Sequence, residues 1–445
     1  MNKKITSILF FFIVAISVQA QTISEKVDVL LNAYQKLYKL NGSVLVVKGS
    51  EILNKGYGYK DATTKELNSN HTIFQIGSVT KQFTATLILK LNEQKKLSLQ
   101  DKLSKYFLQF PNAEKISIEQ LLTHTSGLFN YTNDEKFMEN NSALPLSIDQ
   151  FITFQKEKPL DFEPGEKYSY SNSGYMFLGY IIEKVSGMSY EKYLQQQIFT
   201  PLKMQHSGYN YINLKNENKS EPYGKVVTGE FIKAELVHPS FSYSAGTIYS
   251  TTANLFKWAQ SLTNNSILTK QSYTNATTAR KSNYGFGLVI DSIYNKKRIH
   301  HSGGINGYSS YLLTIPEDSV YIVVLNNVET ANAGKIGQEV LKVLYNQSFT
   351  LPEEKVEIKL PLETLQLYVG EYELAPTFKI VITLENEMLR AQATGQPQFE
   401  IYPLKENRFF VKAVEAEIEF VKNADGKIEK MILYQGGRQI PGIKK

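Results

Sequence analysis

The amino-acid sequence predicts an α+β fold: an antiparallel sheet flanked by helices, a mainly helical subdomain, and a small antiparallel β-domain after them. Strand-like segments lie at 42–53 and again between 284 and 325, so they bracket a long helical middle. The composition changes near Ser348, and short alternating segments separated by turns follow between 379 and 434. With 445 residues, the chain is also longer than one ordinary core, which favours two domains.

The elements of the first part follow from the spacing of apolar residues. A helix is expected at 23–40, strands at 42–47 and 52–53, a buried helix from Ser78 to Lys96, and mostly helices over 103–262. Further strands are expected at Tyr284–Ile290, Arg298–His301, Tyr311–Ile315 and Val320–Leu325, with a last helix at Ala331–Tyr345. The early and late strands are expected to pair in one antiparallel sheet.

The first twenty residues are expected to be a signal peptide. Lys3 and Lys4 precede an almost wholly apolar run from Ile5 to Val18, and small residues follow where a signal peptidase reads. We expect cleavage after Ala20, and hence a bacterial protein that is periplasmic or secreted. A retained membrane anchor is the alternative, but the run is short for a membrane span. No later stretch is long and apolar enough for a membrane span.

Three further segments are expected after the signal peptide. The first domain occupies residues 21–347, a linker occupies 348–361, and a small barrel-like β-domain occupies 362–445. The linker contains Pro352-Glu353-Glu354 and ends at Pro361, and Asp425-Gly426 is a strong hairpin signal within the last domain.

Composition excludes several kinds of site. The sequence has no cysteine, so it offers neither disulfides nor thiolate metal ligands. Its formal net charge is +6, but basic and acidic residues are interleaved, which does not favour nucleic acid as a partner. No cluster of His and Glu has metal-ligand spacing, so we expect no metal.

The first candidate for chemistry is the pair Ser78 and Lys81. On a helix, residues three apart share a face, so the ammonium would lie beside the hydroxyl. A serine is a weak nucleophile until a base takes its proton, and a lysine can be that base if burial lowers its pKa. Taken alone, the pair is more simply a helix N-cap followed by a solvated lysine.

Two further polar stretches lie far along the chain. Tyr170 and Asn172 precede a helical segment and could supply a phenol for proton transfer and an amide for positioning. His300 and His301 stand on a predicted strand, so only one of them can face a given site. His124 is expected to brace a loop rather than to act in catalysis.

In this order, the three stretches resemble the motifs S-x-x-K, S-D-N and K-T-G of the serine β-lactamase and penicillin-binding protein superfamily. Their counterparts are Ser78-Val79-Thr80-Lys81, Tyr170-Ser171-Asn172 and His301-Ser302-Gly303. The leading tyrosine resembles the class C branch, and the leading histidine resembles a branch with many esterases, D-amino-acid peptidases and penicillin-binding-like hydrolases. Supporting stretches are Leu121–Leu128, Phe162–Gly165, Pro201–Met204 and Tyr284–Gly287, and the resemblance covers residues 25–345.

The resemblance implies a β-lactamase/transpeptidase-like fold and a serine hydrolase that forms an acyl-enzyme on Ser78. Lys81 would assist its deprotonation, and Tyr170 would exchange protons with the serine and the leaving group. Asn172 would hold Lys81 and the substrate carbonyl. No metal or organic cofactor is implied.

The resemblance also implies roles for His301, which begins the third motif, and for Gly304, which follows it. The backbone N–H groups of Ser78 and Gly304 would form the oxyanion hole, and His301 would stand near the leaving side of the substrate. Related enzymes carry lysine at that place, whereas histidine is mostly neutral at neutral pH. This replacement of lysine by histidine makes it less expected that the site binds a substrate carboxylate next to His301.

The expected partner is a small-molecule or short-peptide acyl substrate. Cell-wall-type D-amino-acid peptides, β-lactams and esters stay open, as do peptidase, β-lactamase and esterase activity and an association with the cell wall. The alternative is a β-lactam- or peptide-binding sensor module with little turnover, which the attached β-domain motivates. Metal-dependent hydrolysis is a third and disfavoured class.

Overall fold

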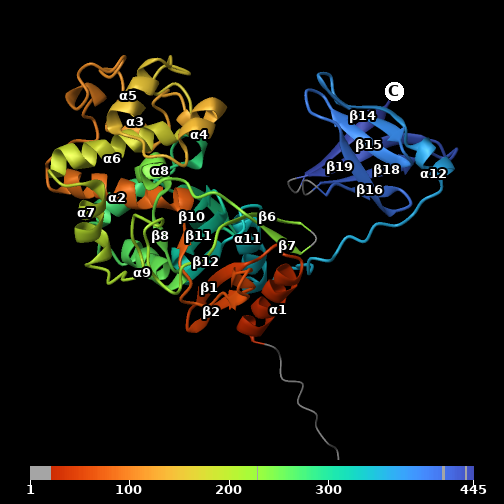
Figure 1. The fold of residues 1–445 in the computed structure, drawn as a ribbon, viewed down its shortest axis with the longest axis horizontal. Coiled ribbons are helices and arrows are strands. Elements are labelled where there is room, and N and C mark those ends of the chain that lie inside the picture. The colour runs from red at the N-terminus through yellow and green to blue at the C-terminus, as the bar shows by residue number, and fades with distance from the viewer. Residues whose placement is uncertain (1–21, 228, 413–415, 436–437) are drawn as a thin grey trace, which may run out of the picture. The chain divides into compact units, whose positions relative to one another are not determined.

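The computed structural model describes residues 22–227, 229–412, 416–435 and 438–445, so the expected signal peptide lies outside the described residues. The chain divides into two compact units, the first ending at Pro352 and the second running from Glu353 to Lys445 (Figure 1). The first unit is an α+β structure and the second a closed β-barrel, which confirms the predicted fold class.

A six-stranded antiparallel sheet in the order β2-β1-β12-β11-β10-β9 forms the centre of the first unit. Its strands are β1 (Gly42–Lys48), β2 (Glu51–Tyr57), β9 (Val289–Ile293), β10 (Lys296–Ile305), β11 (Tyr308–Ile315) and β12 (Val320–Asn326). β1 pairs with β12 along its whole length, with Val44 opposite Val324. The early and late strands therefore share one sheet, as predicted.

Helices cover both faces of this sheet. The helices of the first unit are α1 (Ile23–Lys36), α2 (Thr80–Glu93), α3 (Ile118–Leu122), α4 (Glu135–Asn141), α5 (Ile148–Lys156), α6 (Asn172–Ser186), α7 (Tyr190–Leu194), α8 (Pro239–Gly246), α9 (Thr252–Thr263), α10 (Lys270–Ala276) and α11 (Ala333–Leu344), and of these α1, α9 and α11 pack directly on its strands. α1 and α11 share a core with Val44 and Val46, whereas Leu45 and Val47 of the same strand belong to the core of the helical subdomain. Side chains alternate along a strand, so the four residues from Val44 to Val47 are all apolar because they supply two cores.

Short elements complete the first unit. They are the two-stranded pairs β3 (Tyr59–Asp61) with β4 (Glu66–Leu67), β5 (Phe74–Gln75) with β8 (Tyr249–Ser250) and β6 (Tyr223–Val227) with β7 (Glu230–Lys233), the 3-10 turns η1 (Gly77–Val79), η2 (Leu103–Lys105), η3 (Tyr131–Asn133), η5 (Lys281–Asn283) and η6 (Pro316–Asp318), and the π turn η4 (Gln195–Phe199). The middle of the chain is thus mainly helical with long loops, as predicted.

The strand predicted at Tyr284–Ile290 is wrong before Val289, where β9 begins. A Cβ atom at Gly285 would lie 2.2 Å from the carbonyl oxygen of Ala276 in α10. One at Gly287, whose φ is +71°, would lie 2.6 Å from the carbonyl oxygen of Lys81 in α2. These glycines let the segment lie directly against two helices, so it forms a loop there instead of a strand.

α2 is the central helix of the helical subdomain. Almost every side chain from Thr80 to Leu91 is buried, as the apolar middle of the segment predicts. Phe83 stacks on Trp258 of α9 with ring centroids 4.1 Å apart, and the Trp258 indole donates a hydrogen bond of 2.9 Å to Gln82. α2 also packs against α6 and α8, so its first turn is held from several sides.

The second unit is a closed antiparallel barrel preceded by a short helix, α12 (Leu362–Leu367). Its strands are β13 (Gly370–Ala375), β14 (Phe378–Glu385), β15 (Met388–Ala393), β16 (Phe399–Lys405), β17 (Arg408–Phe410), β18 (Ala416–Lys422), β19 (Ile428–Gln435) and β20 (Arg438–Lys444). The first and last strands, β13 and β20, lie outside the predicted run from 379 to 434. They pair with each other and close the barrel, with Tyr372 opposite Lys444.

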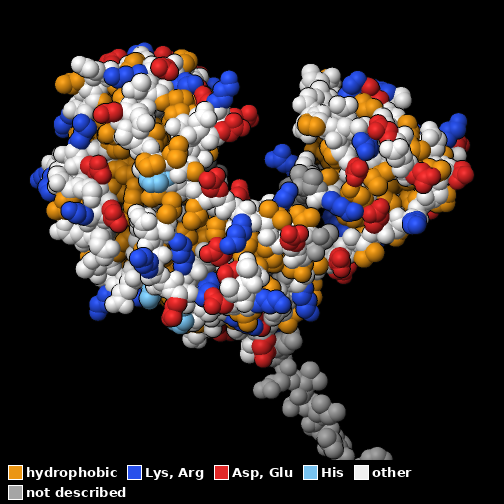
Figure 2. All heavy atoms as spheres, viewed as in Figure 1, with side chains coloured by type: hydrophobic (Ala, Val, Ile, Leu, Met, Phe, Trp, Pro, Cys, Tyr) orange, Lys and Arg blue, Asp and Glu red, His pale blue; other side chains and the backbone are white. Residues whose placement is uncertain are grey.

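The surface carries charges of both signs. On the face shown in Figure 2, lysine and arginine side chains are interspersed with aspartate and glutamate, as the interleaved sequence leads one to expect. Within the described ranges, no helix is both long and apolar enough to cross a membrane.

The turn η1 and strand β10 approach each other at backbone distance. A Cβ atom at Gly303 would lie 2.0 Å from the carbonyl oxygen of Ile76, and one at Gly77 would lie 2.8 Å from the nitrogen of Gly304. The same Ile76 carbonyl accepts a hydrogen bond of 2.7 Å from Ser310 of β11. Only glycine fits at position 303, and the turn is thereby fixed against the sheet.

Replacing Gly303 by alanine is therefore expected to destabilise the first unit by about 1–3 kcal/mol, the usual cost of overpacking. Urea unfolding followed by fluorescence of Trp258, the single tryptophan in the sequence, measures this unit. Gly304→Ala is the matched control, because a Cβ atom there meets nothing within 4 Å. Equal unfolding midpoints for both variants would contradict the close approach.

Candidate active site

Ser78 lies in the turn η1, which leads directly into α2. Gly77 before it has a φ of +49°, a left-handed conformation that glycine adopts without strain. The backbone N–H of Ile76 donates to the carbonyl of Ile248 at 2.9 Å, which holds the start of the turn. The Ser78 side chain stays partly exposed, so a substrate can reach its hydroxyl.

Lys81 lies one turn further on, and its side chain is fully buried. Its Nζ lies 3.0 Å from the Ser78 hydroxyl, 2.8 Å from Oδ1 of Asn172 and 2.8 Å from the carbonyl oxygen of Ala245. No carboxylate accompanies it among these partners. Burial holds the pKa of Lys81 well below its ordinary value, because desolvation disfavours the charged form.

The three neighbours of the Lys81 amine determine where its N–H groups and its lone pair point. The Asn172 and Ala245 oxygens can only accept hydrogen bonds, so a neutral amine gives its two N–H groups to them. Its lone pair then points to the Ser78 hydroxyl, which can donate. The pair predicted from i, i+3 spacing is thus in contact, with the amine oriented to accept the serine proton.

Asn172 reaches this site from the first turn of α6. Its Oδ1 faces Lys81, its Nδ2 donates to Thr132 at 3.1 Å, and its backbone N–H donates to Oδ1 of Asn130 at 3.0 Å. These contacts fix which end of the amide faces the lysine. Asn172 therefore positions the Lys81 amine.

Tyr170 lies over the same amine, with Lys81 Nζ 4.9 Å from its ring centroid. Burial raises the pKa of the Tyr170 phenol far above neutral pH, and a hydrogen bond with Ser78 offsets part of this rise. The phenol is therefore protonated at neutral pH and beside the nucleophile. It can relay a proton without carrying charge in the resting site.

His124 braces the loop that carries Tyr170, as the sequence predicts. Its Nδ1 accepts the backbone N–H of Ser171 at 3.1 Å, and its carbonyl accepts that of Ser169 at 2.9 Å. Its ring packs on Tyr170 with centroids 4.2 Å apart. Burial, together with Lys81 nearby, holds the pKa of His124 well below its ordinary value, so the ring is neutral.

His301 faces this cluster from β10, whereas His300 points away and lies 3.4 Å from a carboxylate oxygen of Asp291. One histidine of the pair therefore enters the site, as strand alternation predicts. The His301 side chain lies 2.9 Å from the hydroxyl of Tyr284 and 2.6 Å from the carbonyl oxygen of Ser302. Burial, with a smaller effect from Lys81, lowers the pKa of His301 to about 3.

Gly304 borders the nucleophile turn. Gly77 lies directly against its backbone, and the space where a Gly304 side chain would stand is open. Gly304 is also exposed, so its backbone is accessible to a ligand. The structure thus brings together all six residues that the sequence singled out: Ser78, Lys81, Tyr170, Asn172, His301 and Gly304.

Two groups of this site were not predicted. The Ala245 carbonyl comes from α8, which is kinked at Tyr243 with a φ of +37°, and a backbone oxygen leaves no signature in sequence. Tyr284 was noted only as part of a supporting stretch. The signal that could have found it is the pair of glycines after it, Gly285 and Gly287, which mark a close backbone approach.

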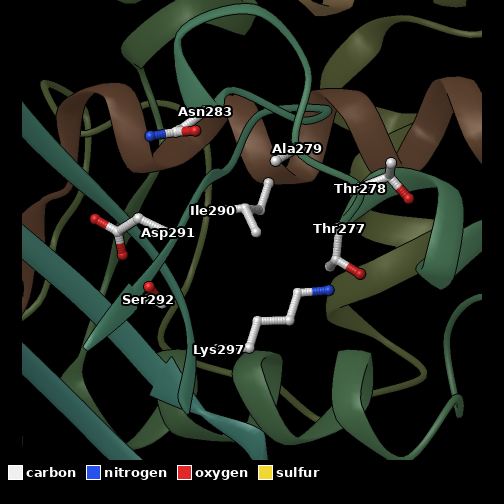
Figure 3. Close-up of a pocket in the computed structure, with 8 residues that line it drawn as sticks. All are labelled: Thr277, Thr278, Ala279, Asn283, Ile290, Asp291, Ser292 and Lys297. Atoms are coloured by element: carbon white, nitrogen blue, oxygen red, sulfur yellow. The ribbon is translucent and has the colours of Figure 1, made fainter. Parts of the chain in front are cut away.

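A cavity on the first unit lies away from this cluster. It measures about 540 Å³ and is lined by Thr277, Thr278, Ala279, Asn283, Ile290, Asp291, Ser292 and Lys297 (Figure 3). None of these residues belongs to the site around Ser78. Within the part of the chain that the structure describes, no three His, Cys, Asp or Glu side chains form a potential metal site.

Each of the two units matches a known protein family. Residues 32–345 match the family described as Beta-lactamase, and residues 354–441 match a domain of unknown function, DUF3471. The chain is 31% identical over 441 residues to penicillin-binding protein 4* of Bacillus subtilis (strain 168), covering 92% of this chain and 95% of that protein.

Solved structures agree with this match. The octameric penicillin-binding protein homologue from Pyrococcus abyssi is 26% identical with a TM-score of 0.66, covering 94% of this chain and 99% of that one. The D-amino acid amidase from Ochrobactrum anthropi SV3 shares the fold, with a TM-score of 0.66 at 23% identity over 73% of this chain and 99% of that chain.

The buried neutral state of His301 predicts a dependence of stability on pH. Its pKa is about 3 when folded and about 6.5 in an unfolded chain, so between these values the unfolded chain binds one more proton. Stability then falls as the pH falls through this window, by about 1.4 kcal/mol per pH unit. His301→Gln removes this contribution, so its stability relative to the unmodified protein should improve by that amount per unit from pH 6 to 4.

Urea unfolding followed by Trp258 fluorescence measures the difference at each pH. His206→Gln, at an exposed position, is the control and should leave the pH dependence of the unmodified protein in place. A constant difference between His301→Gln and the unmodified protein from pH 7 to 4 would contradict the buried neutral ring.

Proposed function

The chain belongs to the beta-lactamase family of serine hydrolases, and from this premise we propose that it is an exported enzyme that cleaves amide or ester bonds through an acyl-enzyme on Ser78. The substrates we propose are cell-wall-type D-amino-acid peptides, β-lactams or esters. The observation that carries the proposal is the buried Lys81 amine 3.0 Å from the Ser78 hydroxyl, with no carboxylate among its hydrogen-bond partners in the described part of the chain.

Acylation follows from these contacts. The Ser78 proton passes to the Lys81 lone pair while the serine oxygen bonds to the substrate carbonyl carbon, whose oxygen takes the electron pair. The backbone N–H groups of Ser78 and Gly304 stabilise this oxyanion. The oxyanion collapses, the bond to the leaving nitrogen or oxygen breaks, and the leaving atom takes a proton from Tyr170. Lys81 then returns the serine proton to the phenol.

Deacylation reverses the same path with water. A water molecule gives a proton to the site and its oxygen attacks the ester carbon, and the tetrahedral intermediate then releases Ser78 with its proton restored. The products are a carboxylic acid and the free enzyme. How fast this step runs separates a hydrolase with steady turnover from a sensor that stays acylated.

Export is part of the proposal. It is supported by the basic start, apolar run and small residues of positions 1–20, which are typical of a signal peptide. A periplasmic or secreted location would also bring the enzyme to cell-wall peptides and antibiotics. The relative named penicillin-binding protein 4* supports substrates of that chemical kind.

Steady hydrolysis of p-nitrophenyl acetate tests the proposal. Ser78→Ala is expected to lower turnover to the uncatalysed background, and Lys81→Ala to slow acylation by about 10² or more, the usual loss with a positioned base. Acylation should also fall as acid protonates Lys81, since an ammonium cannot accept the serine proton. Turnover that survives in Ser78→Ala would refute the proposal, and one equivalent of product without further turnover would favour the sensor.

A further inference from the structure

Both ring nitrogens of His301 are already occupied within the protein. The Ser302 carbonyl can only accept, so Nδ1, 2.6 Å away, carries the ring proton. Nε2 is then the acceptor, and the Tyr284 hydroxyl donates to it over 2.9 Å. Protonating the ring would require the phenol to turn from donor to acceptor, which leaves its own hydrogen without this partner.

The surroundings of His301 also oppose a positive charge. The ring is buried and 4% exposed, and among the described residues no carboxylate faces it. Those groups come from several elements: Lys81 of α2, His124 after α3, Tyr170 before α6, Tyr284 before β9, and His300 of the same strand. All are neutral or positive, so none stabilises an imidazolium.

The backbone fixes where Tyr284 stands. Gly285 next to it lies against Ala276 of α10, and Gly287 lies against the carbonyl of Lys81. The phenol itself is buried, with 1% exposed. The loop that supplies the hydrogen bond to His301 is therefore anchored on the helix that carries the catalytic lysine, and Tyr284 cannot easily move away.

The strand beyond His301 forms the open wall of the site. Ser302 and Gly304 are exposed there, and they offer a hydroxyl and backbone groups without charge. Among the described residues, Lys81 is the only lysine or arginine that hydrogen-bonds to Ser78 or Asn172, and it is buried beneath them. A substrate lying along this wall meets no exposed cation from the catalytic cluster.

We propose that Tyr284 is a specificity-determining positioning residue, which holds His301 as an uncharged ring so that the enzyme selects substrates without a charge on the leaving side. The preferred substrates are then amides and esters, and peptides that end in a free carboxylate on the leaving amino acid are disfavoured. This inference rests on the proposed function, since it concerns the substrate of the same acyl-enzyme site.

A matched pair of substrates tests it: N-acetyl-D-alanyl-D-alanine, which ends in a carboxylate, and its C-terminal carboxamide. For the unmodified protein, the ratio of kcat/KM for the amide to that for the acid is expected to exceed about 10 and to be the same at pH 5.5 and 8.5. In Tyr284→Phe, the freed Nε2 can bind a proton at a higher pH than in the unmodified protein, although burial still opposes the charge, so the ratio should fall, by up to about tenfold, at pH 5.5 and stay unchanged at pH 8.5. Taking a ratio cancels the effect of acid on Lys81.

Two controls isolate the hydrogen bond. Tyr168→Phe removes a phenol from the same aromatic cluster, 5.8 Å from Tyr284 between ring centroids, and should keep the ratio of the unmodified protein. In the double variant Tyr284→Phe/His301→Gln, the dependence of the ratio on pH should disappear. A preference of the unmodified protein for the acid, or a ratio that Tyr284→Phe leaves unchanged at both pH values, would overturn the inference.

Histidine ¹⁵N NMR provides a readout that does not depend on turnover. His301 should remain a neutral Nδ1–H ring at pH 5.5 in the unmodified protein and should titrate at a higher pH in Tyr284→Phe than in the unmodified protein. If the ring titrates alike in both, the inference is wrong even though Ser78-dependent hydrolysis of p-nitrophenyl acetate persists. If that hydrolysis is absent while the NMR result is as expected, the proposed function fails, and the substrate preference fails with it.

Discussion

The structure of the site depends on one buried amine without a counter-ion. Lys81 is fully buried, and among the described residues its nitrogen hydrogen-bonds to the oxygens of Ser78, Asn172 and Ala245 and to no carboxylate. A buried carboxylate partner would keep the lysine charged and unable to accept a proton. Because the partners are an amide, a carbonyl and a hydroxyl, the amine can be neutral, and its lone pair faces the one partner that has a proton to give.

Close backbone contacts hold this amine and its nucleophile in place. Gly303 lets β10 lie against the turn that carries Ser78, and Gly287 lets the Tyr284 loop lie against Lys81 itself. Side chains larger than hydrogen would push these segments apart. The same contacts bring His301 and Tyr284 to the site. Both the position of the catalytic groups and the neutral state of His301 therefore depend on these close glycine contacts.

Local patterns in the sequence predicted the sheet and the buried helix, and the resemblance to a known family singled out the side chains that the structure brings together. Lys81 follows Ser78 by three residues, which fixes their contact wherever the helix lies. The Ala245 carbonyl and the Tyr284 hydroxyl could not be predicted in the same way, since tertiary packing places them. The closing strands of the barrel were missed because Pro441 and Gly442 interrupt the alternation in one of them.

The most direct test of this account is the mass of the intact protein over time after mixing with p-nitrophenyl acetate, an ester without charge on its leaving side, with release of p-nitrophenol followed in the same tube. The account predicts that the ester acylates Ser78, seen as an acetyl adduct or as steady release of p-nitrophenol, and that Ser78→Ala and Lys81→Ala abolish or slow both. An adduct of equal amount and rate in Lys81→Ala would contradict the buried amine as the activating base. An adduct in Ser78→Ala would contradict the nucleophile.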